Sequence, residues 1–169
     1  MKKNLVLLGM MGVGKTTLGK IVANKQKLKF IDIDEVIEQK NLTSISEIFK
    51  KKGEKFFRAE EEKEVLKSLK ESYCVIALGG GAFINTTIRE NILNNAISIW
   101  LDVDIKTLTK RIERSEKRPL LNNMNKPKKM EELYEERKNT YKLANHKLKC
   151  DKLSKEDIVK KIIHLYEKY

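Results

Sequence analysis

A short segment near the start of the chain has the residues of a loop that binds phosphate groups. The sequence from Gly9 to Thr16, GMMGVGKT, matches the pattern G-x-x-x-x-G-K-[S/T] without a gap. Glycines let the backbone turn with its N–H groups facing inward, where they hold phosphate oxygens. Lys15 would reach the β- and γ-phosphates, and the Thr16 hydroxyl would bind Mg²⁺. The motif therefore predicts binding of a nucleoside triphosphate, and it leaves the phosphoryl acceptor open.

The residues expected to contact ATP in this segment are its central loop positions and the first helical ones. They are Gly12, Val13, Gly14, Lys15, Thr16 and Thr17.

Two aspartates follow the second predicted strand. Asp32 and Asp34 are two residues apart, so on a strand their side chains would point the same way. Strand ends line the ligand crevice of an open α/β sheet. We expect Asp32 to support the Mg²⁺ ion together with Thr16, and Asp34 to orient the acceptor hydroxyl for in-line attack. One of the pair could instead cap a helix.

An arginine occurs near the start of a predicted helix, where the helix dipole does not favour a cation. Arg58 could grip a carboxylate with its planar fork, and Glu61, three residues later, could hold that fork. A surface ion pair of little energetic value is the alternative.

Three consecutive glycines end the third predicted strand. Gly79, Gly80 and Gly81 would let the backbone approach a ligand closely. Further on, Arg118 lies in a segment rich in charges that contains both prolines and is expected to form a lid. Lid closure would bring this arginine to the transferring phosphoryl group. Arg137 shares a predicted helix face with Tyr141 and is a second candidate for gripping an anionic acceptor.

The elements that position these residues follow from the apolar pattern. Short apolar runs alternate with longer amphipathic stretches, which is typical of parallel strands joined by helices. We expect one domain over residues 1–169, with a substrate-binding insert at about 34–70 and a lid at about 112–130. Strands are expected over 4–8, 30–33, 74–78, 96–101 and 146–150, helices over 16–27 and 154–168, and two more helices between the second and third strands.

Composition limits the classes of function. The chain is 40% hydrophobic and 36% charged, as a globular domain is, and it has no apolar run long enough for a membrane helix. Most of its net charge of +12 lies after residue 104, and its short lysine runs have no interleaved aromatics. The excess is expected to be solvated surface or to favour an anionic substrate and nucleotide. We expect neither nucleic acid nor a membrane as a partner. The two cysteines, Cys74 and Cys150, fit reduced thiols in the cytoplasm. The apolar N-terminus leads directly into the phosphate loop, so we interpret it as a strand rather than a signal peptide.

Taken together, these motifs resemble the shikimate kinase family. The similarity extends in order from residue 9 to residue 141 and consists of the phosphate loop, Asp32-Ile33-Asp34, Gly53-Glu54 with Phe57-Arg58 and Glu61, the three glycines, Arg118-Pro119-Leu120-Leu121, and Arg137 with Tyr141.

The resemblance implies an α/β P-loop NTPase fold like that of nucleoside monophosphate kinases, with a five-stranded parallel sheet flanked by helices, usually monomeric. It implies transfer of phosphate from ATP, with Mg²⁺, to the 3-hydroxyl of shikimate in aromatic amino-acid synthesis. Shikimate would contact Asp34, Arg58, Gly80, Gly81 and Arg137, with Phe49 and Phe57 near its ring; ATP would contact Arg118 from the lid and Arg111 at the adenine. The chain departs from the family pattern at 150–154, where it lacks the proline of the adenine loop.

Three other functions stay open. A kinase of another small polyol such as gluconate would share the phosphate loop but has less need for two carboxylate-gripping arginines. A nucleoside monophosphate kinase would need a base pocket in the insert, for which the sequence shows no signature. A module that binds ATP without transferring phosphate would not need Lys15, Asp34, Arg58, Arg118 and Arg137 together.

Overall fold

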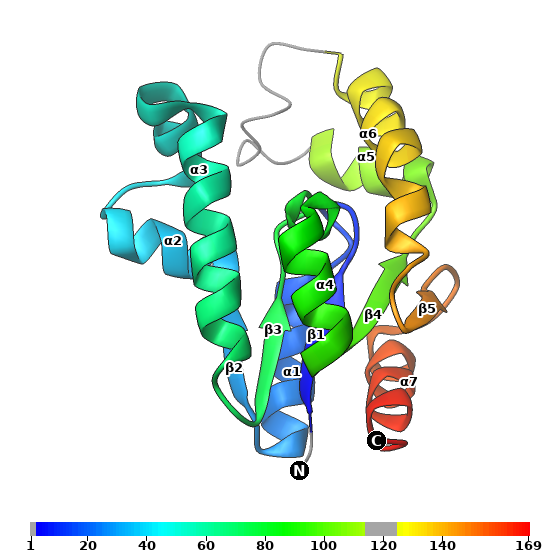
Figure 1. Cartoon of the computed structure of the whole chain (residues 1–169). Coiled ribbons are helices and arrows are strands. Elements are labelled where there is room, and N and C mark those ends of the chain that lie inside the picture. The colour runs from blue at the N-terminus through cyan, green and yellow to red at the C-terminus, as the bar shows by residue number, and fades with distance from the viewer. Residues whose placement is uncertain (1–2, 114–124) are drawn as a thin grey trace.

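The computed structural model describes residues 3–113 and 125–169, and these residues form a five-stranded sheet with helices on both faces (Figure 1). All strand pairs are parallel, in the order β2-β3-β1-β4-β5. The strands are β1 (Asn4–Leu8), β2 (Lys29–Asp32), β3 (Cys74–Ala77), β4 (Ala96–Asp102) and β5 (His146–Lys149). The α-helices are α1 (Lys15–Gln26), α2 (Ile33–Asn41), α3 (Ile45–Leu69), α4 (Thr86–Asn95), α5 (Ile105–Glu113), α6 (Lys126–Tyr141) and α7 (Lys155–Tyr166), with a short 3₁₀ helix, η1, at Ala82–Ile84.

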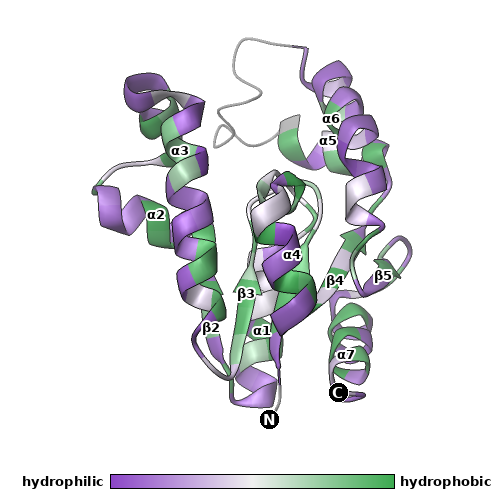
Figure 2. Cartoon of the chain, in the orientation of Figure 1, coloured by the Kyte–Doolittle hydropathy of each residue, from purple (hydrophilic) through white to green (hydrophobic). Residues whose placement is uncertain are grey.

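The three central strands are apolar because both faces of the sheet are covered. Every residue of β1, β3 and β4 is buried, as expected for parallel strands with helices on each side. Helix α1 packs against α7, and α3 packs against α4. In Figure 1, α4 crosses in front of the sheet and α1 lies behind it. Figure 2 shows that hydrophobic residues gather on these strands, whereas α6 carries mostly hydrophilic ones.

The order of the strands determines where a ligand can bind. The connection after β1 leads through α1 to β2, and the connection after β3 leads through α4 to β4, on the other side of β1. Strands β1 and β3 are neighbours, in register from Leu5 opposite Val75 to Leu7 opposite Ala77. In open α/β sheets, ligands bind outside the carboxyl ends of two neighbouring strands whose connections lead to opposite sides of the sheet. The phosphate loop after β1 and the three glycines after β3 meet at this point.

The predicted fold class is confirmed, and the end of the second strand is predicted wrongly. Strand β2 ends at Asp32 and α2 begins at the next residue, so Asp34 is helical and the two-residue strand period does not place it. The expected lid at about 112–130 stays a prediction; within that range, Lys126 to Met130 form the first turns of α6, where Met130 is fully buried. Asn125 caps that helix by accepting a hydrogen bond from the Lys128 N–H.

Within the described ranges, no helix is both long enough and apolar enough to cross a membrane. Both cysteines are buried and neither forms a disulfide.

Candidate active site

The phosphate loop connects β1 to α1 through glycines that take up conformations other residues disfavour. Gly9, Gly12 and Gly14 have φ values of +141°, +82° and +99°. Gly14 occupies the N-cap of α1 without a capping side chain, and no acidic residue stands in the first turn. The N–H groups at this helix end are therefore oriented to bind an anion, and the helix dipole favours negative charge there.

Lys15 folds back along the loop that precedes it. Its Nζ donates hydrogen bonds to the carbonyl oxygens of Gly9, at 2.8 Å, and Met10, at 2.9 Å. The ammonium group is thus held beside the loop rather than in bulk solvent. The neighbouring side chain of Thr17, also expected to contact ATP, is exposed.

Asp32 joins the phosphate loop to α2. Its Oδ2 accepts a hydrogen bond from the Thr16 hydroxyl at 2.5 Å, and its Oδ1 accepts from the N–H groups of Asp34 and Glu35, at 3.0 and 3.3 Å. It is therefore the helix cap considered above and also a neighbour of Thr16. A hydroxyl and a carboxylate this close, beside a site for phosphate oxygens, are oxygen donors that suit Mg²⁺. These residues fit the expected metal.

The glycine turn after β3 leaves room for two carboxylates. A Cβ atom added to Gly79 would lie 2.7 Å from Glu61 Oε1 and 2.9 Å from Asp34 Oδ1. Such distances are too short for carbon and oxygen, so only glycine admits both side chains at this point. The first turn of α2 supplies Asp34, and α3 supplies Glu61.

Two arginines approach the same turn. A Cβ on Gly81 would lie 2.7 Å from both Nη1 and Nη2 of Arg58, and a Cβ on Gly80 would lie 3.2 Å from Arg137 Nη1. Helices α3 and α6, which are separated by more than fifty residues of chain, bring these guanidinium groups together. The turn thus gathers the acceptor-site residues that the sequence predicts.

Arg58 is held in place by carboxylates and an aromatic ring. Its Nη1 donates to Glu61 Oε2 at 2.7 Å, and its Nη2 and Nε donate to Glu54 Oε1 at 3.2 and 3.3 Å. The guanidinium carbon lies 5.2 Å from the centre of the Phe57 ring, which packs against Phe49 at 4.8 Å. The side chain of Arg58 remains 28% exposed, so the fork is fixed yet still accessible to a ligand.

Two buried polar atoms point to a ligand. Among the described residues, Arg137 Nη1 and Glu61 Oε1 lie in buried positions and lack hydrogen-bond partners. Buried polar groups are nearly always partnered, so this arrangement indicates a polar ligand. Burial also raises the pKa of Glu61 to about 6, although the Arg58 guanidinium acts in the opposite direction.

Two further ATP-site residues, Arg111 and Arg118, stay predictions. Arg111 is exposed, and its Nη1 donates to the Gly12 carbonyl at 3.2 Å, so α5 reaches the phosphate loop; the adenine contact stays a prediction. Arg118 lies outside the described residues.

One contact in the site was not predicted from the sequence: the Tyr141 hydroxyl donates a hydrogen bond to the Gly80 carbonyl. The spacing of four from Arg137 was its only signal.

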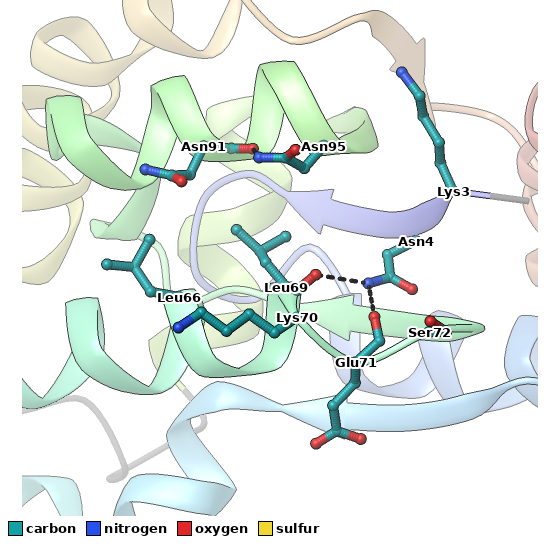
Figure 3. Close-up of a pocket in the computed structure, with 9 residues that line it drawn as sticks. All are labelled: Lys3, Asn4, Leu66, Leu69, Lys70, Glu71, Ser72, Asn91 and Asn95. Atoms are coloured by element: carbon teal, nitrogen blue, oxygen red, sulfur yellow. Dashed lines mark hydrogen bonds between the residues drawn. The ribbon is translucent and has the colours of Figure 1, made fainter. Parts of the chain in front are cut away.

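A pocket of about 580 Å³ lies at the opposite edge of the sheet, beside the start of β1 and the end of α3 (Figure 3). The side chain of Asn4 at this pocket donates to the carbonyl oxygens of Leu69, at 3.4 Å, and Glu71, at 2.6 Å, and accepts from the Cys74 N–H at 3.0 Å. These bonds join β1 to the segment between α3 and β3, so the role of Asn4 is structural. Of the predicted site residues that the structure describes, none lines this pocket.

Comparison with known proteins identifies the family of this chain. A family model described as shikimate kinase matches residues 11–167. The chain is 40% identical to the shikimate kinase of Sulfurihydrogenibium sp. (strain YO3AOP1), over 95% of this chain and 96% of that one. The structure superimposes with a TM-score of 0.94 on a shikimate kinase from Acinetobacter baumannii in complex with shikimate, which is 31% identical and covers 98% of this chain and 93% of that one.

A gluconokinase from Sinorhizobium meliloti gives a TM-score of 0.59 at 12% identity, covering 99% of this chain and 93% of that one, and therefore shares only the fold. The match to the family model extends from the phosphate loop past Arg137 and so includes the residues that meet at the glycine turn. On sequence and structure alike, the chain belongs to the shikimate kinase family.

Proposed function

We propose that this chain transfers the γ-phosphoryl group of ATP to the 3-hydroxyl of shikimate. One observation carries the proposal: Arg58 and Arg137 flank the glycine turn next to Asp34, beside a phosphate loop. Two guanidinium groups provide the planar, bidentate donors that suit a carboxylate. A carboxylate near them can receive a hydrogen bond from a hydroxyl of the same small molecule. An acid that also bears hydroxyl groups meets both requirements, as shikimate does.

The reaction is a direct in-line displacement. The acceptor oxygen forms a bond to the γ-phosphorus as the bond between that phosphorus and the bridging oxygen breaks, and ADP leaves. Asp34 holds the hydroxyl and takes its proton. The loop N–H groups and Lys15 hold the phosphates in line with the acceptor.

The site residues Thr16 and Asp32 would hold Mg²⁺, which supplies positive charge to the phosphate oxygens when bound. Arg118, in the lid, is proposed to balance charge on the transferring group, and Arg111 to lie against the adenine. We also propose that the protein works as a monomer, as the family resemblance implies. The cytoplasm is its proposed compartment, in keeping with two separate buried thiols.

Measurement of ADP release from ATP and Mg²⁺ tests this function. Shikimate, gluconate and nucleoside monophosphates are offered separately as acceptors. We expect turnover with shikimate alone. Turnover with gluconate instead would retain the phosphate-loop argument and reject the acceptor site, whereas ATP binding without any transfer would favour a non-enzymatic role.

A further inference from the structure

A tyrosine beneath the acceptor site has no assigned role in the reaction. Tyr141 ends α6 and is fully buried, with its ring 5.7 Å from that of Trp100. Its hydroxyl donates a hydrogen bond to the Gly80 carbonyl and lies 3.8 Å from the sulfur of Met10 in the phosphate loop. This single hydroxyl therefore contacts both loops that form the crevice.

The hydrogen bond to Gly80 determines the direction of the next N–H group. The described backbone contains no cis peptide bond, and in a trans peptide the C=O of one residue and the N–H of the next point in opposite directions. Because the Gly80 carbonyl is directed at the buried Tyr141, the Gly81 N–H of the same peptide faces away from the core. Gly81 is only half-buried and lies against the Arg58 guanidinium. The N–H therefore faces the side of the turn where the acceptor would bind.

We propose that Tyr141 is a positioning residue for the acceptor: its buried hydroxyl fixes the Gly80–Gly81 peptide so that the Gly81 N–H points at bound shikimate. This role rests on the function proposed above. Tyr141 touches no substrate itself and acts through the peptide that it orients.

The protonation state and surroundings of Tyr141 suit this role. Burial raises the pKa of its hydroxyl to about 12, against the opposing effect of the neighbouring Arg137 guanidinium, so the group stays a neutral donor at physiological pH. Sulfur is a weak acceptor, so the contact with Met10 competes little for the proton. Loss of the hydroxyl would leave a carbonyl without its donor and let the glycine turn adopt other peptide orientations.

The test compares two tyrosine-to-phenylalanine variants. Tyr141→Phe keeps the ring and removes the hydroxyl. Tyr166→Phe is the matched control, because Tyr166 is also buried and its hydroxyl donates to a backbone carbonyl, that of Lys3, at 3.0 Å, at the end of the sheet remote from the site. We expect the KM for shikimate to rise about tenfold in Tyr141→Phe, as for a hydrogen bond lost from a buried carbonyl. The KM for ATP should not change, and Tyr166→Phe should keep both constants.

Several results would overturn the proposal. An unchanged shikimate KM in folded Tyr141→Phe would do so. An equal rise of the KM values for shikimate and ATP would also do so, because it would indicate a general loss of order in both loops. Failure of the unaltered protein to phosphorylate shikimate would instead reject the function on which the proposal rests. Should Tyr141→Phe not fold, the test is an NMR titration of the unaltered protein with shikimate, in which the chemical shifts of the backbone amides are followed. Shikimate should shift the Gly81 amide and leave that of Gly19, buried in α1, in place; an unmoved Gly81 amide would refute the proposal.

Discussion

At the scale of single residues, the proposed acceptor site is an array of charged side chains around three glycines, which have no side chains of their own. Asp34, Arg58, Glu61 and Arg137 reach the glycine turn, and their approach is close enough to exclude a Cβ at Gly79 and Gly81. Opposite charges are paired unevenly: Glu61 holds Arg58, whereas Arg137 Nη1 is left for a ligand. The site therefore offers hydrogen-bond donors to the carboxylate of a ligand. It also offers one carboxylate of its own, that of Asp34, to a hydroxyl of the ligand.

Replacement of Asp34 by asparagine should lower kcat by roughly 10²- to 10⁴-fold, because the amide cannot take the hydroxyl proton. The KM for ATP should stay the same, since the phosphate loop is untouched. Steady-state kinetics with each substrate varied in turn measures both constants. Asp104→Asn is a suitable control: Asp104 accepts hydrogen bonds from the N–H groups of Lys106 and Thr107, at 2.9 and 3.4 Å, and asparagine can do the same. Near-normal turnover of Asp34→Asn would rule out its role as the base.

The pH dependence of stability should reveal the burial of Glu61. Its pKa in the folded chain is about 6, above the ordinary 4.5, so the folded state binds this proton more tightly than the unfolded state does. Its contribution to stability is therefore fully present below pH 4.5 and is lost as the pH rises through 6. A difference of this size corresponds to about 2 kcal/mol.

The measurement is the free energy of unfolding of the wild type and of Glu61→Gln at several pH values. Between pH 4.5 and pH 7 the wild type should lose about 2 kcal/mol relative to the variant. Parallel curves for the two proteins would show that Glu61 titrates in the folded state as it does in the unfolded chain.

At the scale of the elements, a break inside a helix shapes the segment that is proposed to bind the substrate. Helix α3 is interrupted at Gly53, whose φ of 81° and ψ of 168° are not helical. Phe49 lies before the break, Phe57 and Arg58 after it, and the two rings meet at 4.8 Å. Helix α2 is tied to the second half of α3, because Lys40 pairs with Glu60 at 2.7 Å and Glu64 at 2.9 Å. Asp34 and Arg58 are thereby held at the same turn by two linked helices.

Replacement of Gly53 by alanine tests the break. A Cβ there would meet nothing within 4 Å, so the effect comes from the backbone alone. A conformation restricted largely to glycine should cost about 1–3 kcal/mol of stability. The same change should raise the KM for shikimate more than that for ATP, because it moves the aromatic pair and Arg58.

Chemical denaturation and steady-state kinetics provide the two measurements for Gly53→Ala. Lys50→Ala, at an exposed position of the same helix, is the control and should behave as the wild type does. Equal stability of Gly53→Ala and wild type would show that the helix can close across this position without strain.

At the scale of the whole molecule, one sheet supports both of the proposed substrate sites. The phosphate loop and the glycine turn follow neighbouring strands that share the same buried core. Tyr141 contacts both loops from α6, and Arg111 reaches the phosphate loop from α5. Because the two loops belong to one packed unit, we expect this protein to unfold as one cooperative body.

Unfolding in urea should therefore give a single transition. Fluorescence of Trp100, the only tryptophan and buried in β4, should coincide with the loss of helical circular dichroism. ADP with Mg²⁺ at 100 times its dissociation constant should add about 2.7 kcal/mol, and removal of the metal with a chelator should reverse part of that gain. Two separate transitions would show that the insert unfolds independently of the sheet.

The sequence by itself determined the features that depend on local spacing. The phosphate loop, the five strands and the three glycines all follow from short patterns, because a turn or a buried strand needs particular residues at adjacent positions. The same is true of the contact between Arg58 and Glu61, three residues apart on one helix.

The tertiary structure decided what depends on contacts between distant segments. Asp34 lies in the first turn of α2 rather than in a strand, because Asp32 caps that helix. Asp32 also accepts a hydrogen bond from the Thr16 hydroxyl. It also placed Arg137 and Tyr141, from near the end of the chain, against Gly80. Sequence spacing cannot give these distances, because they are fixed by the order of strands in the sheet and by the packing of α6 over it.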